Sequence, residues 1–441
     1  METYFSLRNG RIYNMLNLSY RRIFNIFLIF SYTVILFIYN IFDSDLKGYI
    51  STVVFNLFFL FFLFMCKDKI IFYFLMLLYF LMFNLCVFVG YNDLYLNIVS
   101  NSIFSYFILP IMCLSLLLPL ILINRPNLQK IIDSHLTFYI CLFLGIFGLI
   151  SLIYLLPYST TALLQGAKDV RTSLQETNVL PTGALTTFSV GISMFYPLFI
   201  FLIFYGFVKK INKFIIFLLF IGLLSGLVGG IVFAARDRFL WIPFFLLVNF
   251  WIWYPYLTQE LKLKFKYSFI GFGILSLFFL ILFTLNRFSG SHTGIWGSIL
   301  AYFGAQPYIF AETVEQHNDA LFYGLDLRFP FFLELLGLDV NLVTRDTPYQ
   351  WMFGTLFSDF YMMGGWKYCL LFIFLLNIFY VGIYKYTKNQ PWIFVLFFLL
   401  HMQILTQGIF YFSLGFPGGN LYILLTIILA ILFNFINKVK L

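Results

Sequence analysis

The chain has 441 residues, of which 62% are hydrophobic and only 10% are charged, with a formal net charge of +9. A soluble domain of this length carries about 25% charged residues, so the composition excludes a water-soluble globule. The basic residues lie in short breaks between apolar runs, without a basic arm or a nucleic-acid-binding motif. The positive charge therefore indicates anchoring at a membrane and not a nucleic-acid partner.

Apolar runs long enough to cross a bilayer recur along the whole chain. The first run follows polar residues that include Arg8 and Arg22 and has no small-residue cleavage site after it, so we expect a retained span. The sequence predicts an all-α polytopic membrane protein, a single integral-membrane domain over 1–441. About twelve spans are predicted, near 23–42, 49–66, 70–90, 103–123, 136–156, 185–208, 214–235, 239–257, 267–285, 364–384, 391–411 and 420–437.

The distribution of charge predicts the orientation of these spans. With the N-terminus in the cytoplasm, 18 of the 27 basic residues fall on the inner side and 14 of the 18 acidic residues fall outside. Lys and Arg accumulate on the cytoplasmic side of membrane proteins, so we expect both termini to be cytoplasmic. Two outer loops are then long, residues 157–184 and the larger 286–363. The apolar content of the second loop predicts short helices in the interface or folded over the bundle.

Arginine is favoured over lysine on the predicted outer side. The inner loops hold 13 Lys and 5 Arg, whereas the outer positions hold 3 Lys and 6 Arg. A guanidinium group presents five N–H donors in a planar fork that matches phosphate or carboxylate. This asymmetry predicts an anionic ligand outside, with pairing to the outer carboxylates as the alternative. The outer arginines are Arg171, Arg236, Arg238, Arg287, Arg328 and Arg345.

A very short outer hairpin, Arg236-Asp237-Arg238, follows a helix in which Gly222, Gly226 and Gly230 are four residues apart. Glycines at this spacing line one helical face and allow close helix contact. Two arginines held at headgroup depth by such a helix pair are placed to bind a lipid phosphate. The alternative is a charged turn that only caps two helices.

The large outer loop contains candidates for a general base. Glu312 and Glu315 are three residues apart and share a helix face, and His317 and Asp319 follow directly. Such a cluster can accept a proton in catalysis, and it can equally be a solvated polar stripe. No metal-ligand spacing is present, so we expect neither a metal nor another cofactor.

The predicted span 391–411 contains His401, Gln403 and Gln407. Polar side chains inside a membrane are candidates for function, and interhelical hydrogen bonding is the alternative.

The order of these features resembles the oligosaccharide repeat-unit polymerases (Wzy-type O-antigen polymerases) of the bacterial inner membrane. The resemblance covers most of the chain as topology but only a few short stretches as residues. These stretches are the arginine hairpin after the Gly-rich helix, Arg171 in the first outer loop, and Phe357-Ser358-Asp359-Phe360 before Gly364 and Gly365. The family often has an Arg–Gly pair at the hairpin, which this chain lacks.

The resemblance implies a fold like that of the GT-C glycosyltransferases. It also implies an enzyme that transfers a growing glycan from undecaprenyl diphosphate to the next lipid-linked repeat unit on the periplasmic face. The expected partners are the undecaprenyl diphosphate-linked oligosaccharide, membrane lipids and a chain-length regulator. Fixed arginines can match the charge that develops on a leaving diphosphate without a metal. The residues implied for substrate binding are Arg171, Arg236 and Arg238, with Arg328, Arg345 and Asp359 as further candidates.

Two other functions share parts of this pattern. A lipid-linked oligosaccharide flippase has a similar number of spans, but it usually has short loops and charged residues within the spans. An O-antigen ligase has nearly the same topology and acts on the same carrier, so only the acceptor separates it from a polymerase.

Overall fold

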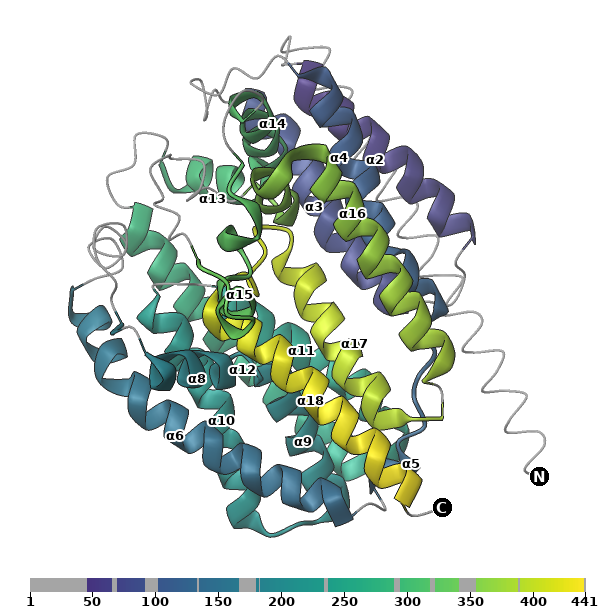
Figure 1. Cartoon of the computed structure of the whole chain (residues 1–441), viewed down its shortest axis with the longest axis vertical. Helices are drawn as coiled ribbons and strands as arrows, with labels where there is room; N and C mark the ends of the chain where they lie inside the picture. The colour runs from purple at the N-terminus through teal and green to yellow at the C-terminus, as the bar shows by residue number, and fades with distance from the viewer. Residues whose placement is uncertain are drawn as a thin grey trace.

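The structure of the chain is a computed structural model (Figure 1). It describes residues 46–65, 70–91, 102–132, 135–165, 180–181, 183–233, 237–288, 294–317, 322–340, 354–387 and 389–439. Within these ranges the chain forms α-helices and short 3-10 helices and no β-strand. The predicted span 23–42 lies outside the described residues.

The N-terminal helices pack against one another near one edge of the bundle. They are α2 (Leu46–Met65), α3 (Ile70–Tyr91) and α4 (Ile103–Leu117), followed by η1 (Leu118–Leu122) and α5 (Gln129–Ile132). Buried polar side chains join them: Ser51 Oγ donates to Tyr106 O at 2.6 Å, and Asn56 Nδ2 donates to Asn84 Oδ1 at 3.1 Å. Small and amide side chains of this kind hold apolar helices together where no hydrophobic difference drives them.

A second group of helices contains the Gly-rich segment. It comprises α6 (His135–Gln165), α8 (Ala184–Ser193), α9 (Tyr196–Lys209), α10 (Lys213–Val232), α11 (Asp237–Trp253), η2 (Tyr254–Tyr256) and α12 (Gln259–Phe288). Helices α8 and α9 meet at a bend of 55°, so the predicted span 185–208 is a broken one. Helix α6 continues to Gln165, which makes the first residues of the predicted loop 157–184 helical.

Short helices occupy the predicted large outer loop. They are α13 (Gly294–Gly304), α14 (Gln306–Gln316), η3 (Gly324–Leu327) and α15 (Pro330–Leu335). Helix α14 packs against α4 and α16, and its residues 306–314 are buried. This part of the loop is therefore folded into the bundle and does not lie on its surface.

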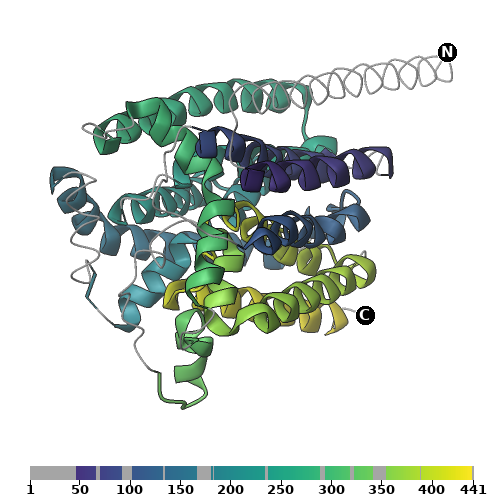
Figure 2. The same ribbon diagram turned by 90° about the horizontal axis from the view of Figure 1, so that it is seen from above.

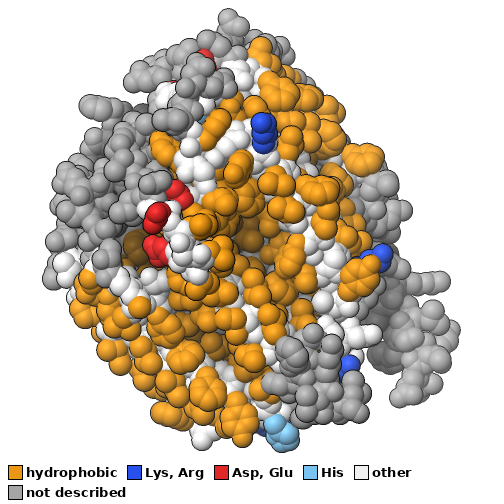
Figure 3. Space-filling model, viewed as in Figure 1, with side chains coloured by type: hydrophobic (Ala, Val, Ile, Leu, Met, Phe, Trp, Pro, Cys, Tyr) orange, Lys and Arg blue, Asp and Glu red, His pale blue; other side chains and the backbone are white. Residues whose placement is uncertain are grey.

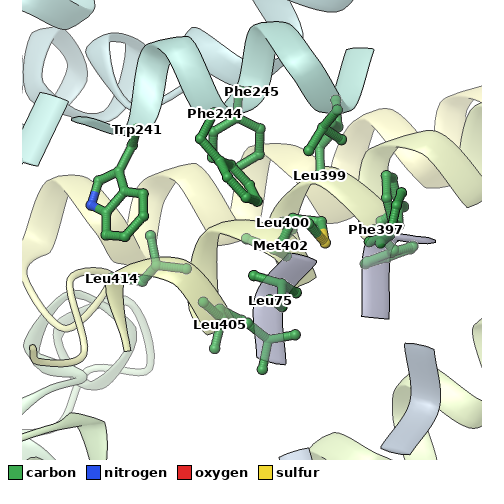
Figure 4. Packing of buried hydrophobic residues seen from close by; sticks show 14 of the residues in the cluster. Leu75, Trp241, Phe244, Phe245, Phe397, Leu399, Leu400, Met402, Leu405 and Leu414 are labelled. Atoms are coloured by element: carbon green, nitrogen blue, oxygen red, sulfur yellow. The ribbon is translucent and has the colours of Figure 1, made fainter. Parts of the chain in front are cut away.

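Helix α17 (Pro391–Gln407) lies in the core, between α16 (Leu356–Tyr386) and α18 (Pro417–Val439), and all of its residues are buried. Such a helix must find apolar partners on every side. Figure 4 shows Trp241, Phe244 and Phe245 of α11 pointing toward α17. Because α17 is packed on every side, its last residue, Gln407, has a fixed position, and the turn that follows begins there.

Six described helices have the length and apolar composition needed to cross a membrane, or seven if the bent α8–α9 pair counts as one span. Each predicted span within the described residues overlaps a helix, and three of them cover two helical segments: 103–123, 185–208 and 239–257. Figure 2 shows α12 and α16 on opposite sides of the bundle. The protein is thus an all-α membrane protein, whereas the total of about twelve spans stays a prediction.

Close contact along the glycine face of α10 is confirmed, and it gives a test of the fold. A Cβ atom on Gly148 of α6 would overlap Gly222 Cα and lie 3.1 Å from Gly222 N. Backbone atoms cannot move aside as a side chain can, so Gly148→Ala must separate α6 from α10. We expect a loss of about 1–3 kcal/mol in the free energy of unfolding, measured in a denaturing-detergent titration.

The matched control is Gly271→Ala in α12, where no atom lies within 4 Å of the added Cβ. A helix-interior alanine is favoured over glycine by up to about 1 kcal/mol, so this variant should be as stable as the wild type or more so. Equal stability of the two variants would contradict the close packing of α6 and α10.

Candidate anion-binding site

The turn between α17 and α18, residues 408–416, is the centre of the site. Backbone hydrogen bonds attach it to the segment that begins α16: Leu356 N donates to Gly408 O at 2.9 Å and Thr355 N donates to Phe410 O at 3.1 Å. A side chain at Gly415 would overlap the Arg328 side chain, so this glycine allows the close approach of Arg328. We call this segment the α17–α18 turn.

Arg328 and Asp359 form a buried ion pair beside this turn. Arg328 Nη2 donates to Asp359 Oδ1, and the other carboxylate oxygen accepts from Phe412 N of the turn at 2.5 Å. The predicted outer arginine and the aspartate of the Phe-Ser-Asp-Phe stretch therefore meet in space. Asp359 also positions the turn by accepting from its backbone.

Some hydrogen-bond donors of the Arg328 guanidinium have no acceptor. Its Nε and Nη1 atoms are buried and have no hydrogen-bond partner among the described residues. The Phe416 ring lies 5.2 Å from Arg328 Cζ, and Asn420 Nδ2 donates to the Arg328 carbonyl oxygen at 3.0 Å. The backbone and one edge of this arginine are thus held in place, while Nε and Nη1, which carry three N–H groups between them, are left for a ligand.

Arg238 is tied to the same turn from α11. It is buried, its Cζ lies 4.9 Å from the centre of the Tyr196 ring, and its Nη1 has no partner in the described part of the chain. Gln407 Nε2, at the end of α17, donates to Tyr196 Oη at 3.3 Å. Ser413 Oγ of the turn donates to Gln407 Oε1. Tyr196 is placed at the α8–α9 bend and packs against Gly226 of the glycine face.

Both arginines therefore lie at the end of the bundle where α17 ends and where α11 and α18 begin. A buried N–H group without an acceptor costs roughly 1–3 kcal/mol, and more when it is charged. An anion with several oxygens can accept from these donors through short, charge-assisted hydrogen bonds. The arrangement can bind a phosphate or diphosphate group, provided that the ligand reaches this end of the bundle.

The predicted general bases lie on α14 and after it. Glu312 is buried, with Oε1 accepting from Gln316 Nε2 at 2.7 Å and Oε2 without a partner among the described residues. His317 is buried at the end of α14, with Nδ1 2.9 Å from Thr313 O. Burial lowers the pKa of His317, so its imidazole is neutral near pH 7 and can accept a proton. Glu315 is half-buried.

The described contacts do not bring these bases to the arginines. No hydrogen bond or ion pair within the described ranges joins Glu312 or His317 to Arg238 or Arg328. Tyr323 lies between the two groups in the chain: its ring is 6.2 Å from that of His317, and it precedes η3 and Arg328. The remaining predicted site residues lie outside the described residues, namely Arg171, Arg236, Asp319 and Arg345.

The three polar residues of α17 differ in their hydrogen-bond partners. Interhelical hydrogen bonding is confirmed for His401, whose Nδ1 lies 2.7 Å from Tyr384 Oη of α16, and for Gln407 through Tyr196. Gln403 is buried, and its side-chain atoms have no partner in the part of the chain that the structure describes. Gln407 belongs to the site, because it links the Tyr196 hydroxyl to the α17–α18 turn.

Sequence reasoning missed four parts of the site: Tyr196, the backbone N–H of Phe412, the hydroxyl of Ser413 and the amide of Asn420. Asn420 stands out as a polar residue at the start of the predicted span 420–437, which is a weak signal. Tyr196 lies in the middle of a predicted span, where a tyrosine gives no sign of contact with an arginine. A backbone donor has no sequence signal at all.

Comparison with family models, with curated proteins and with solved structures finds no match for this chain. Among the described residues, no group of three or more His, Cys, Asp or Glu side chains can hold a metal ion.

Proposed function

We propose that this protein polymerises lipid-linked oligosaccharide repeat units in the bacterial inner membrane. In this proposal about twelve spans, with both termini in the cytoplasm, hold the α17–α18 turn at the periplasmic face in a GT-C-like architecture. The growing glycan is transferred from undecaprenyl diphosphate to the next lipid-linked repeat unit, as the resemblance to the repeat-unit polymerases implies.

One observation carries the proposal: two buried arginines with unpartnered N–H groups are tied to a single turn. A lipid diphosphate has acceptor oxygens for both, and its leaving oxygens gain negative charge as the sugar departs. Donors fixed in a site sheltered from water stabilise such charge in the transition state without reorganising. Arg238 and Arg328 are the residues proposed to bind the diphosphate.

The reaction forms one carbon–oxygen bond, breaks another, and moves one proton from the acceptor to a base. An acceptor hydroxyl oxygen attacks the anomeric carbon of the donor sugar, the bond from that carbon to the diphosphate oxygen breaks, and the hydroxyl proton goes to a base. The neutral imidazole of His317 is the proposed base, and Glu312, Glu315 and Asp319 are the alternatives. The undecaprenyl diphosphate released can return to the carrier pool.

The test is a gel of surface polysaccharide from a strain that lacks the gene, complemented by the wild type, by Arg238→Ala and by a matched control. The control is Lys262→Ala, because Lys262 Nζ also lies over an aromatic ring, 4.2 Å from the centre of Tyr254, but away from the α17–α18 turn. Membrane levels of each variant are compared by immunoblot.

The gel separates polysaccharide chains by their number of repeat units, which gives a ladder of bands. If the protein is a polymerase, we expect this ladder to collapse to a single-repeat band in the deletion strain. The wild type and Lys262→Ala should restore the ladder, and Arg238→Ala should not. Loss of the single-repeat band as well would indicate the flippase or the ligase instead. An unchanged ladder in the deletion strain would reject all three functions.

A further inference from the structure

Six lysines lie where α9 ends, where α10 begins and in the first turns of α12. They are Lys209, Lys210, Lys213, Lys262, Lys264 and Lys266. The predicted spans 185–208, 214–235 and 267–285 each have one of these lysines directly at a boundary. Lysine side chains at this position extend to the membrane surface, at the depth of the lipid headgroups. We call these six residues the lysine cluster.

The helices that carry the lysine cluster are held side by side. Phe265 of α12 stacks on Phe204 of α9 with the ring centres 4.1 Å apart, and it packs edge-on against Phe207 at 5.5 Å. Glu260 of α12 is close enough to Lys210 to interact with it electrostatically. Helix α10 follows α9 in the chain and packs against it. The lysines of the three helices therefore form one patch of positive charge.

Most of this charge has no counter-ion in the protein. Within residues 207–214 and 254–267, all of which the structure describes, Glu260 is the only carboxylate. It pairs with Lys264, and both side chains of this pair are exposed. No ion pair in the described part of the chain joins a carboxylate to the other five lysines. Because each lysine near a membrane surface strengthens the attraction of anionic lipid, the lysine cluster favours an anionic headgroup.

An exposed apolar stripe on α12 begins at the lysine cluster. Leu263, Tyr267, Ile270 and Ile274 are spaced by four, three and four residues, so they share one face of the helix. Their exposed fractions lie between 47% and 67%. Lys266 lies three residues after Leu263 and four before Ile270, which places it on the same face. A hydrocarbon chain can therefore lie along this stripe while its headgroup contacts the lysine.

No helix among the described residues covers the stripe at its centre. Gly271 lies four residues after Tyr267 on this face, and a Cβ atom added to it would have no atom within 4 Å. Figure 3 shows how apolar the surface of the protein is on the face drawn there, where hydrophobic side chains cover most of the described area and charged ones form small, separate groups. In a membrane such a surface contacts lipid chains, so the stripe is open to them.

The combination of exposed lysines and an apolar stripe selects the occupant. An ammonium group is a compact, hydrated point charge, which suits a phosphate in the hydrated headgroup layer. A free phosphate ion would use only the lysines, and a neutral lipid would use only the stripe. An acidic segment of another protein would place polar side chains against the stripe. The ligand that uses both parts is an anionic phospholipid.

We propose that the lysine cluster and the stripe of α12 bind an anionic phospholipid, with its phosphate at Lys209, Lys210 and Lys266 and an acyl chain along the stripe. This site is separate from the candidate anion-binding site. Helix α11 runs from that site toward the lysine cluster over 17 residues, or about 25 Å. Just after the end of α11, the Tyr254 ring lies 4.2 Å from Lys262 Nζ. The proposal therefore does not depend on the polymerase function.

The experiment measures lipid binding to the purified full chain by native mass spectrometry. The probes are dioleoyl phosphatidylglycerol, which is anionic, dioleoyl phosphatidylcholine, which has the same chains and no net charge, and soluble glycerol phosphate. The test variant combines Lys209→Gln with Lys266→Gln. The control variant combines Lys130→Gln with Lys385→Gln, which removes the same charge from two lysines that are also exposed.

The control lysines lie at the same end of the bundle as the lysine cluster. Leu128 N, two residues before Lys130, donates to Tyr256 Oη of η2 at 2.8 Å. Lys130 Nζ donates to Asn389 O at 3.3 Å, in the connection that follows Lys385 and α16. Neither lysine belongs to the cluster or to the stripe. The control therefore separates a local site from the general positive charge of this end.

We expect the wild type to bind phosphatidylglycerol more tightly than phosphatidylcholine. Each lysine near anionic lipid contributes a factor of about five, so the test variant should bind phosphatidylglycerol about 25-fold more weakly. Its binding of phosphatidylcholine should be unchanged, and the control variant should bind as the wild type does. Ile270→Ser, which interrupts the stripe, should weaken the binding of both lipids. All of these side chains are exposed, so their replacement should leave folding intact.

Four outcomes would overturn the proposal. An equal loss in the test and control variants would show that the whole end attracts lipid without a local site. Displacement of phosphatidylglycerol by an equal concentration of glycerol phosphate would indicate a site for free phosphate. Unchanged lipid binding by Ile270→Ser would exclude the stripe. Equal binding of the two lipids by the wild type, with tighter binding of a polyglutamate peptide, would indicate an acidic protein partner instead.

The outcome is independent of the polysaccharide ladder. An unchanged ladder in the deletion strain would reject the polymerase and leave the lipid site standing if the test variant alone loses phosphatidylglycerol. A ladder that collapses in that strain, with equal lipid binding by all variants, would support the polymerase and reject the lipid site.

Discussion

Replacing Asp359 by alanine is expected to lower the free energy of unfolding by about 3–5 kcal/mol, because it leaves the buried guanidinium of Arg328 without its counter-ion. The same change removes the acceptor for Phe412 N, which loosens the α17–α18 turn. The measurement is a denaturing-detergent titration of the purified protein, followed by tryptophan fluorescence.

A double variant separates the cost of an unpaired charge from the role of the pair. Replacing a buried ion pair by apolar residues of similar size is often neutral or stabilising, so Arg328→Met with Asp359→Leu should regain most of the stability that Asp359→Ala loses. If Arg328 binds the diphosphate, this stable double variant should still fail to restore the polysaccharide ladder. Restoration by the double variant would exclude Arg328 from the reaction.

An exposed ion pair supplies the control for stability. Lys264 and Glu260 of α12 also form an ion pair, but their side chains are 67% and 75% exposed. Water and salt screen such pairs, so Glu260→Ala should leave the unfolding titration unchanged. A loss as large as that of Asp359→Ala would show that burial is not the cause of the effect.

The second large effect concerns the rate of transfer and the geometry of Arg238. Removing one fixed donor from a site of developing negative charge typically lowers the rate by about 10²–10³-fold. We expect this loss for Arg238→Ala with purified protein and a lipid-linked repeat unit. Arg238→Lys should fall between alanine and the wild type, because lysine keeps the charge but loses the planar fork that lies over Tyr196.

The lysine variant distinguishes transition-state binding from simple attraction. If Arg238 acted only through its charge, Arg238→Lys would turn over at the wild-type rate and differ only in its dependence on salt. Lys262→Ala again serves as the control, with no change in rate expected. Full activity of both Arg238 variants would contradict the proposed role of this arginine.

The helices could be predicted from the sequence because a membrane imposes one strong condition. Backbone N–H and C=O groups in hydrocarbon must be paired within the segment, so an apolar run of sufficient length has to be helical. For this reason the predicted spans 70–90 and 214–235 agree closely with α3 (Ile70–Tyr91) and α10 (Lys213–Val232). The close contact of α10 was also predictable, because the spacing of Gly222 and Gly226 is a local property of one helix.

The break within α16 is a feature that the sequence alone predicted only in part. Gly364 and Gly365 marked the start of a predicted span, and the helical segment begins earlier, at Leu356, with Gly365 at φ +68°. Only glycine adopts this left-handed conformation readily, so the pair of glycines indicated a change of direction. The sequence predicted short helices in this loop, but nothing in it indicated that one of them continues into the span and contains the buried Asp359.

By itself, the sequence determined that this is an α-helical membrane protein, and it singled out Arg238, Arg328 and Asp359 as candidates for binding. Only the tertiary structure decided that Arg328 pairs with Asp359, 31 residues away, and that the α17–α18 turn joins this pair to Arg238 through Gln407 and Tyr196. The physical reason is the range of the forces. Helix formation depends on neighbours a few residues apart, whereas a buried charge finds its partner among residues that packing brings together.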